Sequence, residues 1–173
     1  MVGVTGELSR FNEGFFAYKQ GGAKGVDFQR MLVQKPPIEK GRILASSGCT
    51  SCIDLPDGLI KALNDTAGDY GFVIDDSEIP VNMGDYKASG MKIRYRHEMA
   101  SYPAGDIELL FTIPEKRRGS LEEKFGYAGL KIYWIGKVVS KPGIHIDSGG
   151  GKLLEPGVAG FVHRFKGKML FDR

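Results

Sequence analysis

The chain has 173 residues, of which 42% are hydrophobic and 26% are charged, and its net charge is +3 at pH 7. This length and composition are typical of one globular domain. The weak charge, with no long run of lysine and arginine, does not favour a nucleic-acid-binding protein, and no apolar run approaches the roughly 20 residues of a membrane-spanning helix.

Glycine is frequent, with 25 residues, which favours many turns over a helical bundle. Residues 1–10 lack the apolar segment of a secretory signal. We therefore expect no signal peptide and no stable membrane insertion. If the protein acts in the periplasm or cell wall, it gets there through another export route, delivery or lysis.

Residues 1–50 are predicted to form an irregular N-terminal extension that packs on the core. Short apolar runs at 15–18, 31–33 and 42–46 suggest short strands within it. The role of this extension stays open between a delivery or virion partner, a cell-wall polymer and the core of the protein itself.

The clearest predicted helix begins after Pro56 and Asp57. Leu59, Ile60 and Leu63 recur at helical spacing. Pro56 and Asp57 fit a helix start, and a glycine at 68 or 71 fits its end. The apolar run 72–74 then predicts a strand that leaves this helix.

The remaining chain alternates predicted strands with one short helix. Ser120 and Glu123 have the spacing of a capping box and predict that helix. Period-two alternation or β-branched content predicts strands over 91–95, 107–113, 130–139 and 144–147, and a hairpin over 161–171.

These elements predict an α+β fold with a small, mainly antiparallel sheet, one or two helices packed on it, and the irregular N-terminal extension. We expect a single domain over 1–173, with a core over 55–150 and a C-terminal hairpin within 151–173. The glycine run 149–151 follows a strand but opens no helix, so it does not predict a phosphate-binding loop.

Two of the three histidines suggest a metal site. A catalytic zinc ion typically takes three nitrogen or oxygen ligands and keeps one position for water. His97, Asp106 and His145 supply such a set. In a strand over 144–147, His145 and Asp147 point to the same face, so Asp147 lies where a general base is needed.

The order of these residues resembles the zinc D-Ala-D-Ala carboxypeptidase and L-Ala-D-Glu endopeptidase family. The family pattern is Ser-x-His, then Gly-x-Ala-x-Asp, then a third ligand in a short strand, such as Gly143-Ile144-His145-Ile146-Asp147 here. The resemblance covers roughly residues 55–150. The spacing departs from the family, because Asp106 follows His97 by nine positions rather than seven.

The resemblance implies a zinc-dependent metallopeptidase, with Zn²⁺ as cofactor and a peptidoglycan peptide as substrate. Many relatives carry a glutamate three residues before the third ligand, where this chain has Pro142. The general base is therefore assigned to Asp147, with Glu98 as a second candidate. Arg94 and Arg96 would bind a substrate carboxylate through their forked donors.

Two alternatives remain. Abundant glycine and short strands also suit a non-enzymatic structural protein such as a virion component. A thiol hydrolase using Cys49 with His145 is the other. Cys49 and Cys52 form the sequence Cys-Thr-Ser-Cys, which fits half of a zinc site, a redox pair or a local disulfide.

Overall fold

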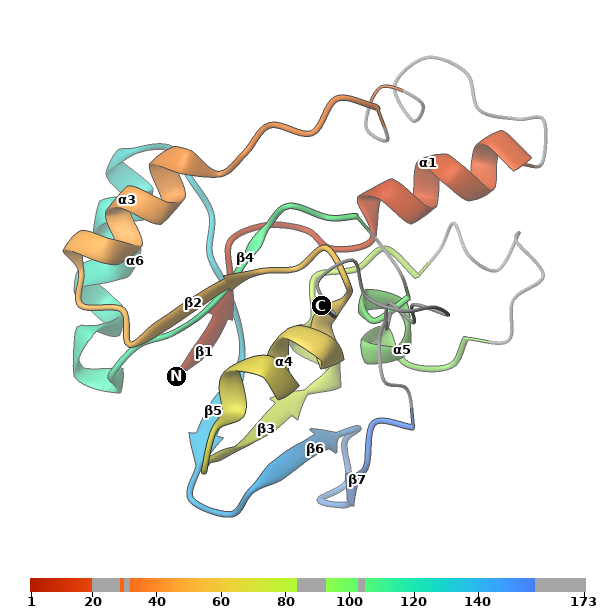
Figure 1. Cartoon of the computed structure of the whole chain (residues 1–173). Helices are drawn as coiled ribbons and strands as arrows, with labels where there is room; N and C mark the ends of the chain where they lie inside the picture. Colours follow the sequence, from red (N-terminus) through yellow and green to blue (C-terminus); the bar gives the residue numbers. More distant parts are fainter. Residues whose placement is uncertain (20–28, 30–31, 84–92, 103–104, 158–173) are drawn as a thin grey trace, which may run out of the picture.

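The structure is a computed structural model that describes residues 1–19, 29, 32–83, 93–102 and 105–157. A seven-stranded sheet forms the centre, and helices cover both of its faces (Figure 1). The predicted α+β class and the mainly antiparallel sheet are confirmed. The sheet is larger than the small one expected.

The strand order is β2-β4-β1-β5-β3-β6-β7. Neighbouring strands are antiparallel, apart from the parallel pair of β3 and β6. The strands are β1 Val2–Val4, β2 Ser51–Asp54, β3 Gly71–Asp75, β4 Leu109–Thr112, β5 Tyr133–Val139, β6 Gly143–Asp147 and β7 Leu153–Leu154.

The helices lie on opposite sides of this sheet. In Figure 1, α3 and α6 lie together at one end of the molecule, and α4 lies in front of the strands. None of the described helices is long and apolar enough to cross a membrane. The helices are α1 Arg10–Lys19, α3 Ile38–Ser46, α4 Leu59–Ala67, α5 Arg96–Ala100 and α6 Arg118–Tyr127, with short 3-10 turns η1 Asp76–Glu78 and η3 Glu115–Arg117.

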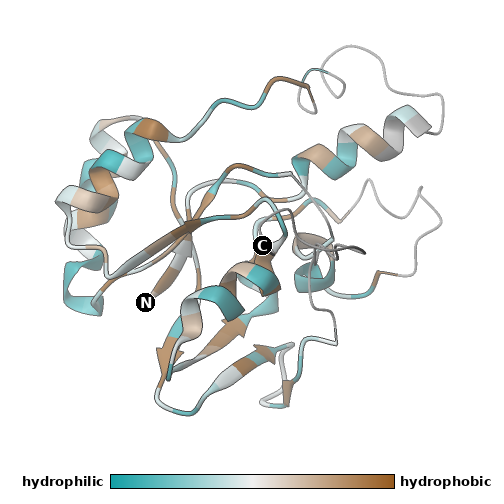
Figure 2. Ribbon diagram, viewed as in Figure 1, coloured by the Kyte–Doolittle hydropathy of each residue, from teal (hydrophilic) through white to brown (hydrophobic). Residues whose placement is uncertain are grey.

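The larger core lies between α4 and one face of the sheet. Leu59, Ile60 and Leu63 turn their side chains inward and are at most 1% exposed. They pack with inward residues of the strands, including Phe72 and Ile146. Figure 2 shows β3 largely in the hydrophobic colour and β6 in alternating colours, whereas α4 also carries hydrophilic residues on its outer side. The 3.6-residue spacing therefore identified the buried face of α4.

The smaller core lies on the opposite face, under α3 and α6. Leu44 of α3 and Phe125 of α6 pack there with Phe111 of β4. The Phe111 ring meets Trp134 edge to face, with 5.5 Å between centroids. Gly3 of β1 lies beneath these rings, and a Cβ atom there would come within 2.6 Å of Phe111. The close approach of two aromatic rings requires glycine at this point.

Most predicted elements after residue 55 are confirmed, with shifted ends. α4, β3, β4, β5 and β6 are all present, and α6 begins at Arg118, before the predicted cap at Ser120.

The N-terminal half differs more from the prediction. Residues 15–18 lie in helix α1, and residues 42–46 lie in helix α3, so both strand predictions are wrong. β1 forms a central strand rather than part of an irregular extension. Of the predicted strand 91–95, residues 93–95 are not in a strand, while Met91, Lys92, Met31 and the C-terminal hairpin lie outside the described residues.

Helix α4 offers a direct test of this packing. Leu63→Ala is expected to lower the free energy of unfolding by about 2–5 kcal/mol, because a fully buried leucine leaves a cavity when it is truncated. Leu153→Ala is the matched control, since Leu153 is 49% exposed, and it is expected to cost much less. Urea denaturation measures both, and equal losses would contradict the buried position of Leu63.

Candidate functional site at the start of helix α4

His97, the first predicted zinc ligand, lies in α5 and is 2% exposed. Its Nδ1 lies 2.6 Å from Oδ1 of Asp76, and its ring stacks on Tyr95 with 5.4 Å between centroids. Asp76 also accepts hydrogen bonds from the backbone N–H groups of Arg96 and His97. Burial alone would raise the pKa of Asp76, but hydrogen bonds from His97 and Arg96 outweigh it and hold that pKa below its ordinary value. The imidazole therefore anchors α5 to η1.

Asp106, the second predicted ligand, lies just before β4 and is 4% exposed. Its carboxylate accepts hydrogen bonds from the backbone N–H groups of Ser9 and Phe11, at the start of α1. The first N–H groups of a helix have no partner within the helix, and a carboxylate there satisfies them. Asp106 thus caps α1.

His145, the third predicted ligand, lies in β6 opposite Val73. As predicted, it shares a sheet face with Asp147, because Ile144 before it and Ile146 after it both turn into the core. The buried Nε2 of His145 has no hydrogen-bond partner among the described residues. Asp147, the predicted general base, accepts a hydrogen bond of 2.9 Å from the N–H of Gly149 and so closes the turn after β6.

The other predicted site residues hold backbone in place. The Glu98 carboxylate accepts hydrogen bonds from the N–H groups of Arg94 and Tyr95 and caps α5. The Arg96 guanidinium donates to the carbonyl groups of Ile79 and Val81, at 3.0 and 2.8 Å. Arg94 is exposed and precedes α5 rather than lying on a strand. The two arginines therefore do not form a carboxylate clamp on a common strand face.

The structure does not bring the predicted ligands together. Within the described ranges, no group of three or more His, Cys, Asp or Glu residues could hold a metal ion. His97 is hydrogen-bonded to Asp76, Asp106 caps helix α1, and His145 lies in strand β6. The zinc cofactor remains a prediction without a ligand set among these residues.

A different pair of acidic residues flanks the start of α4. The edge strand β2 ends at Asp54, and three residues later Asp57 precedes the helix. The N–H of Gly58 donates to the carbonyl of Leu55 and closes a turn over residues 55–58. The chain thus returns from the sheet onto its face within four residues, with Asp54 just before the turn and Asp57 within it.

Gly58 fixes the position of this helix start. It has φ +92°, and a Cβ atom there would lie 2.8 Å from the backbone of Ser101. No side chain of its own caps α4, so the hydroxyl of Ser101 accepts a hydrogen bond from the N–H of Ile60, at 3.3 Å. Glycine is needed here for both the left-handed backbone and the close contact. The end of α5 therefore holds the first turn of α4.

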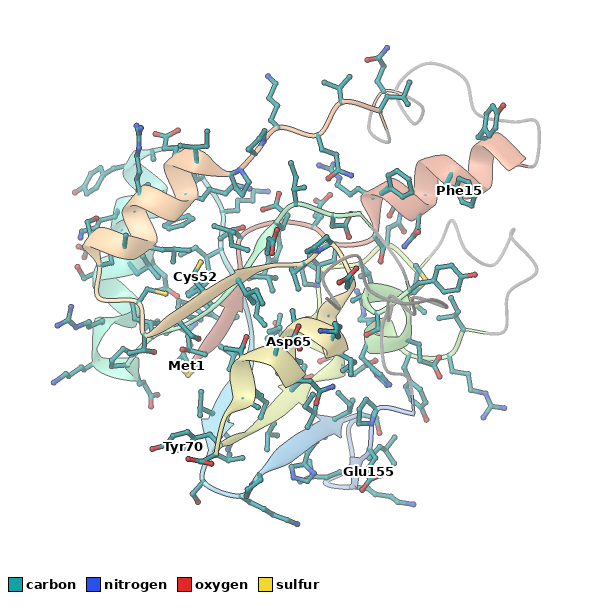
Figure 3. All side chains as sticks on the ribbon, viewed as in Figure 1. Met1, Phe15, Cys52, Asp65, Tyr70 and Glu155 are labelled. Atoms are coloured by element: carbon teal, nitrogen blue, oxygen red, sulfur yellow. The ribbon has the colours of Figure 1, made fainter. Side chains whose placement is uncertain are left out.

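Asp54, Asp57 and Lys61 line a small hollow of about 100 Å³ beside this turn. Lys61 forms an ion pair with Asp65, one turn further along α4, which is labelled in Figure 3. The aspartates outnumber the lysine, so the hollow is negative, yet the helix N-terminus next to it favours an anion. A phosphate group bridged to the carboxylates by a divalent cation satisfies both requirements.

The chain also has larger hollows. One of about 480 Å³ lies between the segment 33–40 and the segment 106–108. Its polar groups largely bond to one another, since Lys40 pairs with Glu108 at 2.8 Å and Asp106 caps α1. A second, of about 450 Å³, lies on the sheet face that carries Asp147. Both hollows also carry carboxylates, Glu39 and Glu108 in the first and Asp75 and Asp147 in the second, and the first includes the opening turn of α3.

The curated proteins similar to this chain are thiamine-monophosphate kinases. No family model matches the chain. The thiamine-monophosphate kinase of Escherichia coli strain K12 is 33% identical over 122 residues, which cover 68% of this chain and 37% of that protein. The thiamine-monophosphate kinase of Pyrococcus horikoshii is 30% identical over 152 residues, which cover 84% of this chain and 44% of that protein. The chain thus spans less than half the length of these relatives.

Solved structures show the same fold. Thiamine-monophosphate kinase from Stenotrophomonas maltophilia K279a superimposes with a TM-score of 0.68 over 84% of this chain and 49% of that one, at 20% identity. AaThiL in complex with AMPPCP and TMP superimposes with a TM-score of 0.69 over 93% of this chain and 50% of that one, at 22% identity. The E. coli hydrogenase maturation protein HypE superimposes with a TM-score of 0.70 over 90% of this chain and 48% of that one, at 17% identity. The fold is therefore that of about half of each of these chains.

These findings correct the functional reading of the sequence. The resemblance to zinc peptidoglycan peptidases is wrong, because the similar proteins are thiamine-monophosphate kinases. The metallopeptidase class and the peptidoglycan peptide as substrate fall with it. The Cys49–His145 hydrolase fails on geometry, because Cys49 precedes the edge strand β2 while β6 lies five strands along, roughly 24 Å away at the usual strand spacing.

Sequence reasoning missed Asp54 and Asp57 as a site. Asp57 was interpreted as part of a helix start, which is correct but incomplete. The available signal was the order of Asp54, Asp57 and Gly58 between a strand and an amphipathic helix. Such a junction places carboxylates at the positive end of a helix dipole.

The capping role of Asp106 predicts a pH dependence. Burial raises its pKa to about 6, above the ordinary 3.8, although the N–H groups of Ser9 and Phe11 oppose the shift. The native protein thus binds this proton more tightly than the unfolded chain. Relative to Asp106→Asn, the free energy of unfolding of the wild type is expected to rise by roughly 2–3 kcal/mol as pH falls from 7 to 4.

Urea denaturation of both proteins across this pH range measures the gain. Other titrating groups contribute equally to both proteins and cancel in the difference. A difference that stays constant or shrinks toward low pH would contradict the buried environment of Asp106.

Proposed function

We propose that the chain supplies part of a kinase that transfers a phosphoryl group from a nucleoside triphosphate to thiamine monophosphate. In this proposal the junction between β2 and α4 binds the phosphates of the nucleotide. The remaining part of such a kinase, which the relatives have and this chain does not cover, completes the active site.

The sequence similarity to thiamine-monophosphate kinases carries the proposal. It reaches 33% identity over 122 residues in one relative and extends to 84% of this chain in another. The agreement in fold with AaThiL, whose complex contains AMPPCP and TMP, supports it. AMPPCP is an analogue of ATP that resists transfer of its terminal phosphoryl group, and TMP is the acceptor that the name of the kinase states.

The local chemistry supports a phosphate site at this junction. The N–H groups at the start of α4 point out of the helix, and that of Ile60 donates to the hydroxyl of Ser101. A helix N-terminus of this kind attracts an anion with its free N–H groups and its dipole. The fixed contact between Gly58 and Ser101 keeps these donors in one position, so binding does not have to order them.

A magnesium ion fits this donor set. Mg²⁺ in kinases is usually held by one or two carboxylates together with substrate phosphates rather than by a complete protein cage. Asp54 and Asp57 are two such carboxylates in one small hollow, and the described residues offer no group of three or more that could hold a metal ion. When bound, the ion neutralises the negative charge of the phosphates. Asp54 and Asp57 would hold it, and the first turn of α4 would orient the phosphate.

Substitution of the two aspartates tests the proposal. Asp54→Asn and Asp57→Asn are each expected to weaken magnesium-dependent binding of AMPPCP by at least about tenfold, because a contact to a charged group contributes about 1.5–3 kcal/mol. Isothermal titration of the intact chain with AMPPCP, with and without Mg²⁺, measures this.

The matched control is Asp69→Asn, an exposed aspartate just beyond the other end of α4. It changes the net charge by the same amount and is expected to leave binding unchanged. Absence of AMPPCP binding to the wild-type chain would refute the proposed function. Equal weakening in all three variants would refute the assignment to the β2–α4 junction.

A further inference from the structure

The chain contains two cysteines, Cys49 and Cys52, and the candidate site uses neither of them. Cys49 lies between the end of α3 and the start of β2, and Cys52 is the second residue of β2. Both thiols are free, Cys49 is partly buried and Cys52 is exposed. Figure 3 labels Cys52 on this strand. Small oxidants and reductants in solution can therefore reach the pair.

The two side chains contact each other. Both lie beside the smaller core, because Cys49 packs against that core and Cys52 pairs across the strands with Phe111, which belongs to it. The Cys49 thiol lies 2.8 Å from the carbonyl oxygen of Ser51. The backbone holds this arrangement, because the N–H of Cys49 donates to Leu44 of α3 and the N–H of Thr50 donates to Thr112 of β4. Two anchored elements thus hold the backbone of this segment, and with it the two thiols, on the same side of β2.

This contact divides the roles of the two thiols. The hydrogen bond from Cys52 lowers the pKa of Cys49 to about 7, against the opposing effect of burial. The same bond raises the pKa of Cys52, because that thiol keeps its proton as the donor. Since the thiolate is the reactive form, Cys49 is the nucleophile and Cys52 is the second partner.

We propose that Cys49 and Cys52 are a reversible redox modification site, in which hydroperoxides oxidise the pair to an intramolecular disulfide. The geometry that carries this inference is the anchored contact between one partly buried and one exposed thiol. A metal half-site is disfavoured, because no further His, Asp or Glu among the described residues joins the two sulfur atoms to form a group of three.

The reaction consumes one hydroperoxide. The Cys49 thiolate attacks the terminal peroxide oxygen, the O–O bond breaks, and Cys49 becomes a sulfenic acid while hydroxide leaves from hydrogen peroxide, or an alkoxide from an organic hydroperoxide. The Cys52 thiol then attacks the Cys49 sulfur, the S–O bond breaks, and the S–S bond forms. The proton from Cys52 and the departing oxygen give water. Two electrons pass from the pair to the peroxide, and a dithiol reductant returns them.

Alkylation of the folded chain with iodoacetamide across a pH range tests the division of roles. Peptide mass spectrometry follows Cys49 and Cys52 separately. Cys49 is expected to react first, with a midpoint near pH 7. Cys52→Ala removes the hydrogen bond and is expected to slow Cys49 alkylation at pH 7 by about tenfold, because the thiolate fraction falls. Cys52→Ser keeps a hydroxyl donor and is expected to stay close to the wild type.

Oxidation with one equivalent of hydrogen peroxide tests the disulfide. The wild type is expected to lose both titratable thiols and regain them with dithiothreitol. Cys52→Ser is expected to stop at the sulfenic acid, which dimedone traps on Cys49. Two thiols that remain titratable after peroxide, direct formation of sulfinic acid without a disulfide, or stoichiometric zinc binding by the pair would each overturn the proposal.

Discussion

The packing of helix α4 on the sheet is the contact on which the candidate site depends. Leu59, Ile60 and Leu63 lie in the larger core, so the helix cannot slide or rotate without exposing them. Its first turn is also held by Gly58 and Ser101, which meet backbone to backbone. Two carboxylates and the N–H groups at the start of α4 therefore keep a fixed relation to each other. A site that is ordered before its ligand arrives binds without an additional entropy cost.

The sequence predicted those parts of the fold in which local pattern and burial agree. α4, β3 and β6 carry their apolar residues at the period of the element they form. α3 did not follow this rule, because Leu44 is its one fully buried residue and the short run 42–46 is equally consistent with a strand. β1 was missed for a different reason. Three residues suffice for a central strand when both neighbours supply hydrogen bonds, and these neighbours come from residues far along the chain.

The predicted zinc site shows how rare residue types can mislead. Histidine and aspartate are ligands in metal sites, but buried ones more often satisfy backbone N–H groups or each other. His97 pairs with Asp76, and Asp106 caps α1 from a position about a hundred residues away. Neither partner could be identified without the tertiary fold. The pair at Asp54 and Asp57, in contrast, lies within a single junction and was accessible to sequence reasoning.

The edge strand β2 carries both the thiol pair and one carboxylate of the candidate site. Cys52 and Asp54 are two residues apart, about 7 Å along an extended strand, and share one side of it. Ile53 between them packs into the larger core and pairs with Leu110 of β4. A movement of Cys52 during oxidation reaches Asp54 only if this central contact yields. Because β2 has a neighbour on one side alone, the packing of the partly buried Ile53 is what separates the proposed redox pair at one end of the strand from the proposed phosphate site at the other.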